Sequence, residues 1–294
     1  MRTARRRRLA RDRFGLAYAS PVAAVVAVFF VVPILLVVYM SGTNWKLLGG
    51  NQGINFPDNY GDVVDHRMFW PAVSFTLKYT VIATVLLIAV GLGLAMLVQE
   101  TSRWRGLLRT AFLLPTALGL ASSSLLFYSL YSPQVGPFND FFKSIGIASI
   151  LGSPNGALWA TVFLIVWRYS GFYMLLLLVG LQGISGEIYE AARIDGASPG
   201  QIFTRITIPL LRPSLALSII MCVTGSLLAF DQFFILTKGG PDGSTMTIVQ
   251  LVYNLAFESK RSLGLAAALS VIALVALVVV NIFQLRVLRG KGDE

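Results

Sequence analysis

The stretch that decides the fold is EAARIDGASPGQIFTRITIP, residues 190–209. This polar segment separates two long apolar runs, and its pattern predicts two short helices joined by a tight turn. Gly196 can end the first helix, because glycine readily takes the left-handed conformation that a helix C-terminus needs. Ser198 and Gln201 have the spacing of a capping box around Pro199, which starts the second helix. We interpret the segment as a docking element; the alternative is an ordinary amphipathic connector.

The rest of the chain is too apolar for an ordinary soluble domain. Its 294 residues are 55% hydrophobic and 13% charged, and the mean hydropathy is +0.71. A membrane-spanning helix needs about 20 mostly apolar residues. Six runs meet this condition, at residues 16–40, 72–98, 107–130, 157–181, 214–236 and 263–288. We therefore expect an all-α, polytopic membrane protein with six transmembrane helices and both termini on one side.

The distribution of basic residues predicts the orientation. Seven arginines lie among the first 13 residues, and the apolar run that follows is too long for a signal peptide and lacks a clear cleavage site. With the N-terminus inside, sixteen of the 24 Lys and Arg residues are cytoplasmic and seven are outside, while Arg168 is intramembrane. This excess predicts an N-in, C-in topology. The net charge of +10 then reflects attraction to anionic lipid headgroups and requires no nucleic-acid partner.

These features divide the chain into four predicted parts. The parts are an Arg-rich cytoplasmic tail (1–15), the first span with its outside loop (16–71), a five-span core (72–288) and a C-terminal cytoplasmic tail (289–294). The core contains the segment that we call the docking loop, residues 187–209.

The sequence lacks the residues that covalent chemistry would need. There is no phosphate-binding G-x-x-x-x-G-K-[ST] loop and no H-E-x-x-H pair. Cys222 is the only cysteine and His66 the only histidine, so no cysteine-built metal site and no intrachain disulfide can form. We expect a protein that is not an enzyme, binds no metal and binds no cofactor itself.

Ionisable and aromatic residues within the spans are candidates for a translocation pathway. An intramembrane charge is costly and suggests function by default. Arg168 is the clearest case, and Asp231 near the end of the fifth predicted span is a possible partner. The alternative is an interhelical ion pair that only fixes packing. Aromatic side chains that can stack on an apolar ligand face accompany the two charges, at Trp167, Tyr169, Phe230 and Phe234.

The order of several motifs resembles one family of transport proteins. The docking loop resembles the EAA loop of ABC importer permeases at Glu190, Ala191, Ala192, Asp195, Gly196, Ala197, Ile206 and Pro209. Beyond the fifth predicted span, a T-x-G-G-P pattern resembles that of permeases that pair with a second, related permease. Its matching residues are Thr237, Gly239, Gly240, Pro241 and Thr245. The likeness covers roughly residues 70–285 and is to the maltose-transporter-type, carbohydrate-uptake permeases, which have the type I importer fold.

This resemblance implies a subunit of an ATP-driven importer in the inner membrane of a prokaryote. It implies a second permease chain, two copies of an ATPase that use ATP and Mg²⁺, and an extracytoplasmic solute-binding protein. The implied cargo is a sugar or oligosaccharide, moved by alternating access. The alternative cargo is glycerol-3-phosphate or a related phosphodiester, with Arg168 as anion partner. A proton-coupled transporter is disfavoured because the spans hold few acidic residues and no histidine; a non-transporting scaffold would leave the docking loop without a role.

Overall fold

The structure is a computed structural model that describes residues 18–100, 102–134, 136–137, 139–144, 146 and 149–289. The predicted N-terminal tail and residues 290–294 lie outside this part. The described chain is mostly helical and forms two compact units. One unit comprises the residues up to 65 together with 252–272, and the other comprises 66–251 and the residues from 273 onward.

The first unit combines a long apolar helix with a small β-hairpin. The helix Tyr18–Ser41 contains a π-helical turn, η1 (Ala27–Val31), followed by α2 (Val32–Ser41). Strands β1 (Thr43–Lys46) and β2 (Gly50–Ile54) pair antiparallel, and Lys46 also bridges to Ser262. The remaining elements of this unit are α3 (Asp58–Val64), η4 (Asn254–Glu258) and the first turns of α15 (Leu263–Arg289). The hairpin is a small two-stranded addition to a chain that is otherwise mostly helical, as the predicted all-α class requires.

Hydrogen bonds from one buried asparagine hold this unit together. The Asn59 Nδ2 atom donates to the backbone carbonyls of Ser41 and Thr43, each at 2.9 Å. These bonds join α3 to the end of the long helix and the start of β1. Gly264 packs at the same place, because a Cβ atom there would lie 2.2 Å from the Thr43 carbonyl oxygen.

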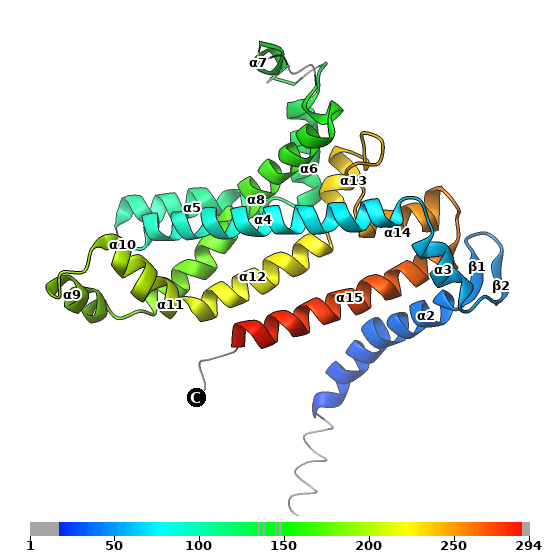
Figure 1. The fold of residues 1–294 in the computed structure, drawn as a ribbon, viewed down its shortest axis with the longest axis horizontal. Coiled ribbons are helices and arrows are strands. Elements are labelled where there is room, and N and C mark those ends of the chain that lie inside the picture. The colour runs from blue at the N-terminus through cyan, green and yellow to red at the C-terminus, as the bar shows by residue number, and fades with distance from the viewer. Residues whose placement is uncertain are drawn as a thin grey trace, which may run out of the picture. The chain divides into compact units, whose positions relative to one another are not determined.

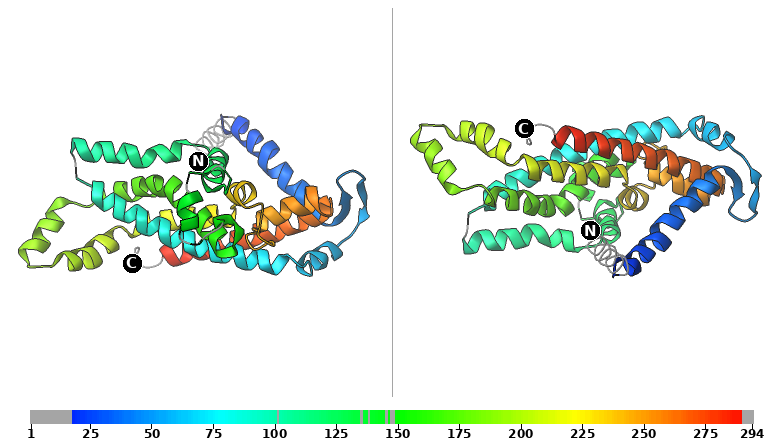
Figure 2. Two further views of the ribbon diagram at one scale, coloured as in Figure 1. Left: turned by 90° about the horizontal axis from the view of Figure 1, so that it is seen from above. Right: turned by 90° about the horizontal axis from the view of Figure 1, so that it is seen from below.

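The second unit is a helix bundle built around α8 (Pro154–Gln182). Helices α4 (Phe69–Val98), α5 (Arg103–Ala117) and α12 (Arg212–Leu227) lie along it (Figure 1), and the views of Figure 2 agree. Shorter elements lie at the end of the bundle that carries the T-x-G-G-P residues 237–245. They are α6 (Leu120–Tyr131), α7 (Asn139–Ser144), η2 (Ile150–Gly152), α13 (Asp231–Leu236) and α14 (Ile248–Tyr253). The docking loop lies at the other end of this bundle (Figure 1).

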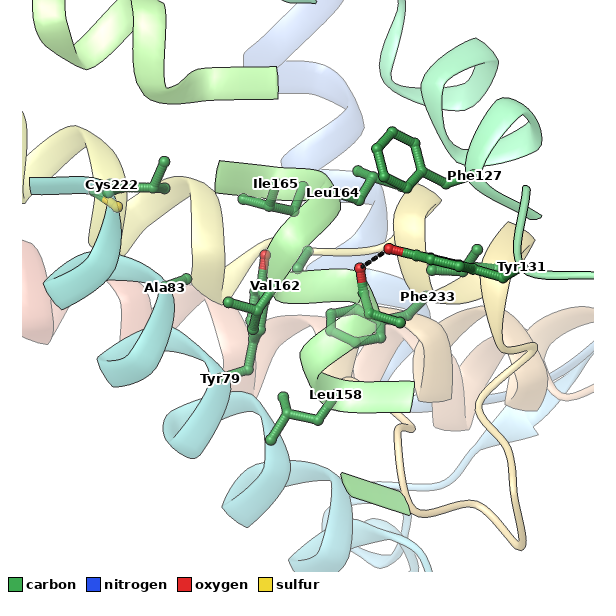
Figure 3. Packing of buried hydrophobic residues seen from close by; sticks show 14 of the residues in the cluster. Tyr79, Ala83, Phe127, Tyr131, Leu158, Val162, Leu164, Ile165, Cys222 and Phe233 are labelled. Carbon is green, nitrogen blue, oxygen red and sulfur yellow. Dashed lines mark hydrogen bonds between the residues drawn. The ribbon is translucent and has the colours of Figure 1, made fainter. Parts of the chain in front are cut away.

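Aromatic rings fill the core where these helices meet (Figure 3). The Phe233 ring packs edge-on against Tyr79, with the ring centroids 4.8 Å apart. The Tyr131 hydroxyl donates to the Ala160 carbonyl at 3.4 Å, as the dashed line in Figure 3 marks. The three rings come from α4, α6 and α13, and the Ala160 carbonyl belongs to α8, so the core fixes how these four helices lie within the unit.

Two glycines allow α8 to approach its neighbours closely. A Cβ atom at Gly91 would lie 2.9 Å from the Tyr173 Cβ atom, and one at Gly171 would lie 2.0 Å from the Phe112 carbonyl oxygen. Gly93, two residues after Gly91, has no such contact, because a Cβ atom there would meet no atom of the chain within 4 Å.

Not every predicted span is one straight helix. Four helices are long and apolar enough to cross a membrane, and two bent helix pairs bring the total to six if each pair crosses once. The predicted span 107–130 is corrected to α5 and α6, which meet at 92°. The second bent pair is Pro199–Leu210 with α12, at 69°. The predicted span 214–236 is itself corrected to two helices, because α12 ends at Leu227 and α13 begins at Asp231. Apolar composition alone does not reveal where a backbone bends.

Candidate functional site

The docking loop begins with helix α9 (Gly186–Ile194), which ends in a Schellman motif. The Ala197 amide donates to the Ala192 carbonyl at 3.0 Å, and the Gly196 amide donates to the Arg193 carbonyl at 3.1 Å. Gly196 has φ +76°, the left-handed conformation predicted for it. A Cβ atom at Gly196 would meet no atom within 4 Å. Backbone conformation rather than space therefore favours glycine here.

The second half of the docking loop also follows its sequence signals. Helix α10 (Pro199–Ile202) begins with the predicted capping box, in which the Ser198 amide donates to Gln201 Oε1 at 2.8 Å. A π-helical turn, η3 (Phe203–Thr207), then leads into α11 (Ile208–Leu210). Pro209 has no N–H group, so it cannot donate the helical hydrogen bond to the carbonyl one turn earlier. The wider π-helical turn η3, which precedes Pro209, accommodates this missing hydrogen bond.

The side chains of the docking loop face two ways. Glu190, Ala191 and Asp195 are exposed, whereas Ala192 is buried and Ile206 is half-buried. The exposed surface also carries an apolar side chain, because Ile194 is 86% exposed.

A cavity of about 820 Å³ lies behind the loop. Both halves of the docking loop line it, together with the ends of α4 and α8. The hydroxyls of Tyr189 and Thr207 are 3.3 Å apart and link the two halves beside it. The loop therefore stands away from the bundle as a separate hydrogen-bonded element.

A second cavity, of about 350 Å³, lies among α4, α8, α12 and α13, and we call it the bundle cavity. Three of the six predicted pathway residues line it, namely Tyr169, Phe230 and Asp231. Asp231 is exposed in the first turn of α13, where the helix dipole favours a negative charge. The structure thus brings one carboxylate and several aromatic rings to one cavity.

The other three predicted pathway residues do not line the bundle cavity. Trp167 packs against Phe127, with ring centroids 5.2 Å apart, within the core. Phe234 stacks on Phe230 at 5.0 Å and supports that ring. Arg168 is only 8% exposed, and its guanidinium Nε and Nη2 atoms donate to the Leu118 carbonyl at 3.0 and 2.6 Å. The predicted Arg168–Asp231 ion pair does not form in the described part of the chain.

Several polar residues of the bundle cavity were not predicted from the sequence, namely Tyr79, Tyr173, Ser226 and Gln232. Gln232 is 3% exposed and donates from Nε2 to the Tyr79 hydroxyl at 3.3 Å. Its Oε1 atom is buried and has no hydrogen-bond partner among the described residues. The two residues are 153 positions apart, so no local pattern could have paired them.

The T-x-G-G-P residues form a tightly cross-linked turn at the end of α13, and we call residues 237–245 the T-x-G-G-P loop. The Thr237 and Thr245 hydroxyls are 2.7 Å apart, and the Thr245 hydroxyl also donates to the Gly240 carbonyl at 2.7 Å. Gly239 has φ +80°, and the Gly240–Pro241 peptide is cis. All five predicted residues of this motif therefore belong to one compact structure.

The T-x-G-G-P loop also lines a hollow of about 330 Å³ with the segment after α6 and the turn η2. The residues of the hollow include Gln134, Ser149 and Thr237, and no Asp, Glu, Lys or Arg is among them. In the described ranges, no group of His, Cys, Asp and Glu could hold a metal ion.

Comparison with known proteins gives the family. Residues 88–291 match the family described as binding-protein-dependent transport system inner membrane component. The chain belongs to this family. It is therefore a multi-pass inner-membrane permease subunit and is not itself catalytic.

Relatives of this permease match over nearly its whole length. It is 33% identical over 291 residues to the trehalose/maltose transport system permease protein MalF of Thermococcus litoralis, covering 96% of this chain and 95% of the relative. It is 34% identical over 293 residues to the lactose transport system permease protein LacF of Rhizobium radiobacter, covering 95% of both. The multiple sugar-binding transport system permease protein MsmF of Streptococcus mutans is 35% identical over 266 residues, covering 88% of this chain and 89% of the relative.

A solved structure confirms the fold of the permease. A chain of a bacterial alginate ABC transporter, solved in complex with an alginate pentasaccharide-bound periplasmic protein, superposes with a TM-score of 0.83. The match covers 96% of both chains at 22% identity. The expectation of a helical ABC importer permease fold is confirmed.

Proposed function

We propose that this permease imports a sugar or oligosaccharide into the cytoplasm by alternating access, driven by a separate ATPase that uses ATP and Mg²⁺. The observation that carries the proposal is the bundle cavity, where Tyr169 and Phe230 offer ring faces and Asp231 offers a hydrogen-bonding carboxylate. Sugars present apolar ring faces edged by hydroxyls, and this combination binds both parts. The names of the relatives, which include maltose, trehalose and lactose, support the same cargo class.

The structure disfavours the alternative cargo, glycerol-3-phosphate or a related phosphodiester. That alternative required Arg168 as the anion partner, but Arg168 does not line the bundle cavity, and its Nε and Nη2 atoms donate to the Leu118 carbonyl. Only its buried Nη1 atom has no hydrogen-bond partner among the described residues. The charged side chain that does line the cavity is Asp231. A carboxylate repels a phosphate, so a neutral sugar suits this wall better.

The surface of the docking loop suits a contact with the ATPase dimer. Glu190 and Asp195 offer exposed charges, Ala191 keeps the surface shallow, and Ile194 offers an exposed apolar side chain. We place this loop and both termini on the cytoplasmic side, from the sixteen-to-seven division of basic residues. Closure of the ATPase pair would then move a rigid element, and the permease would switch between two states.

We place the T-x-G-G-P loop on the opposite side, where a solute-binding protein would deliver the cargo. Its hydroxyl and backbone cross-links keep Thr237, Gly240 and Pro241 in a fixed shape beside the neutral polar hollow. A preformed surface loses little entropy when a partner binds. A second, related permease would complete the pathway.

The cargo class is testable with the assembled transporter. Proteoliposomes that contain the permease, its partner permease and the ATPase would be loaded with ATP and supplied with the binding protein encoded beside them. We expect ATP-dependent uptake of a labelled disaccharide, such as maltose, trehalose or lactose, and none of labelled glycerol-3-phosphate. The reverse preference would refute the sugar assignment, and vesicles without ATP are the control.

A further inference from the structure

The bend between α5 and α6 is held by reciprocal bonds with the middle of α8. We call residues 116–120 the elbow. Arg168 donates from Nε and Nη2 to the Leu118 carbonyl, and the Thr116 hydroxyl donates back to the Arg168 carbonyl at 2.8 Å. Each side therefore supplies a donor and an acceptor, although the two segments are about 50 residues apart in the chain.

The hydrogen bonds from Arg168 satisfy the Leu118 carbonyl, which the bend leaves without a partner inside a helix. Leu118 is the C-terminal cap of α5, and its extended backbone takes it out of the helix. Carbonyls at a helix C-terminus have no partner within the helix and carry the negative end of the helix dipole. In an apolar bundle an unpaired carbonyl is costly, so a buried cation that donates two hydrogen bonds suits this position.

The surroundings of Arg168 hold it at the elbow. Its guanidinium carbon lies 4.3 Å from the centroid of the Tyr169 ring, a cation–π distance. Less than one turn along α8, Gly171 lets α5 approach so closely that a Cβ atom would lie 3.0 Å from the Leu113 Cα atom. The close packing and the hydrogen bonds act on the same pair of helices.

Both partners of the Arg168–Leu118 contact have a near neighbour in the chain that lines the bundle cavity. Leu120 follows Leu118 by two residues and lines the cavity, and Tyr169 follows Arg168 and also lines it. Arg168 itself does not. We propose that Arg168 is a positioning residue that holds the elbow against α8 and thereby sets where Leu120 and Tyr169 stand in the cavity wall. Its importance for transport rests on the proposed function of that cavity.

The chain offers a matched control for this arrangement. Arg109 donates from Nε and Nη2 to the Val98 carbonyl at 3.0 and 2.5 Å, at the end of α4. This is the same forked contact of an arginine with a helix-terminal carbonyl. Neither Arg109 nor Val98 lines the bundle cavity. Arg109 also donates from Nη2 to the Gln99 and Glu100 carbonyls at 3.4 and 3.3 Å. Its replacement therefore removes at least as many hydrogen bonds, and none of them involves the elbow.

The test measures how fast a cysteine at position 120, in the wall of the bundle cavity, reacts with a thiol reagent. A Leu120→Cys variant in a Cys222→Ser background, within the assembled transporter, would be reacted with a small neutral thiol reagent. Arg168→Met should raise the reaction rate at position 120 by about threefold or more, the scale of one hydrogen bond between membrane helices. Thr116→Val should raise it less, and Arg168→Lys should restore part of the wild-type rate. Arg109→Met should leave it unchanged.

Uptake completes the test. Arg168→Met should lower uptake while the amount of intact transporter stays near that of Arg109→Met. If Arg168→Met does not assemble, Thr116→Val still reports on the elbow, because it keeps every charge. An unchanged rate at position 120 in both elbow variants would overturn the proposal. The labelling needs no substrate, so it stands even if sugar uptake fails in the wild type.

Discussion

At the scale of single residues, the structure separates positions that depend on backbone conformation from those that depend on contact. Gly196 requires a left-handed φ but has open space around it, whereas Gly171 has no room for a Cβ atom. Tyr169, Phe230 and Asp231 share a cavity wall, whereas Arg168 serves a neighbouring backbone carbonyl. Residues that sequence reasoning grouped together therefore have different expected effects when they are changed.

Gly196→Val should weaken attachment of the ATPase. A side chain with a Cβ atom in the left-handed conformation costs about 1–2 kcal/mol, and a branched one costs more. Gly200→Val is the matched control, because Gly200 lies four residues away, has no positive φ and also has open space around it. Co-purification of the ATPase should fall for Gly196→Val only. Equal retention by both variants would show that the Schellman turn does not orient the docking surface.

Asp231→Asn should lower sugar uptake without lowering the abundance of the permease. The amide keeps the size of the side chain but removes its charge, so its hydrogen bonds to sugar hydroxyls become weaker by about half. Asp58→Asn is the control, because Asp58 is likewise exposed in the first turn of a short helix, α3, and does not line the bundle cavity. The measurement is uptake normalised to membrane abundance. Unaltered uptake in Asp231→Asn would remove this carboxylate from the pathway.

At the scale of helices and turns, local sequence signals predicted the ends of helices correctly, but they did not predict where helices bend. The Schellman turn and the capping box depend on neighbouring residues, so the sequence was enough to predict both. The elbow at Leu118 was missed because apolar residues continue on both sides of it, and the bond that stabilises it comes from Arg168, 50 residues away. The β1–β2 hairpin was missed because its hydrogen bonds join segments that were interpreted as one irregular loop.

Close helix contacts give a prediction at this scale. Gly171→Ala places a Cβ atom 2.0 Å from the Phe112 carbonyl oxygen, so α5 and α8 must separate. Gly93→Ala meets no atom within 4 Å and removes the cost of a glycine in a helix, about 1 kcal/mol. Thermal unfolding in detergent should therefore shift downward for Gly171→Ala and not for Gly93→Ala. Identical shifts would argue against a close contact of the two helices.

At the scale of the whole molecule, orientation in the membrane remains a prediction from charge. The sixteen-to-seven division of basic residues predicts both termini and the docking loop inside. Single-cysteine labelling in a Cys222→Ser background tests it at two exposed positions, Gln134 and Ser198. An impermeant thiol reagent added to intact cells should label Gln134→Cys and not Ser198→Cys. The opposite pattern would invert the topology.

The large exposed apolar area also concerns the whole chain. In the most apolar 18-residue stretch of the helix Tyr18–Ser41, no residue is buried within the chain. In water such a surface would drive association, so the permease requires lipid or a partner chain to cover it. This agrees with a subunit that works inside a membrane assembly.

ATP-dependent uptake tests the central claim that a separate ATPase drives sugar import through the docking loop. Complete transporters with wild-type permease or with Glu190→Lys would be placed in proteoliposomes and supplied with the sugar-loaded binding protein. The account predicts sugar accumulation only with internal ATP, and a strong loss in Glu190→Lys although both permease chains insert into the membrane. Full ATP-driven uptake in Glu190→Lys, or sugar accumulation without ATP, would contradict it.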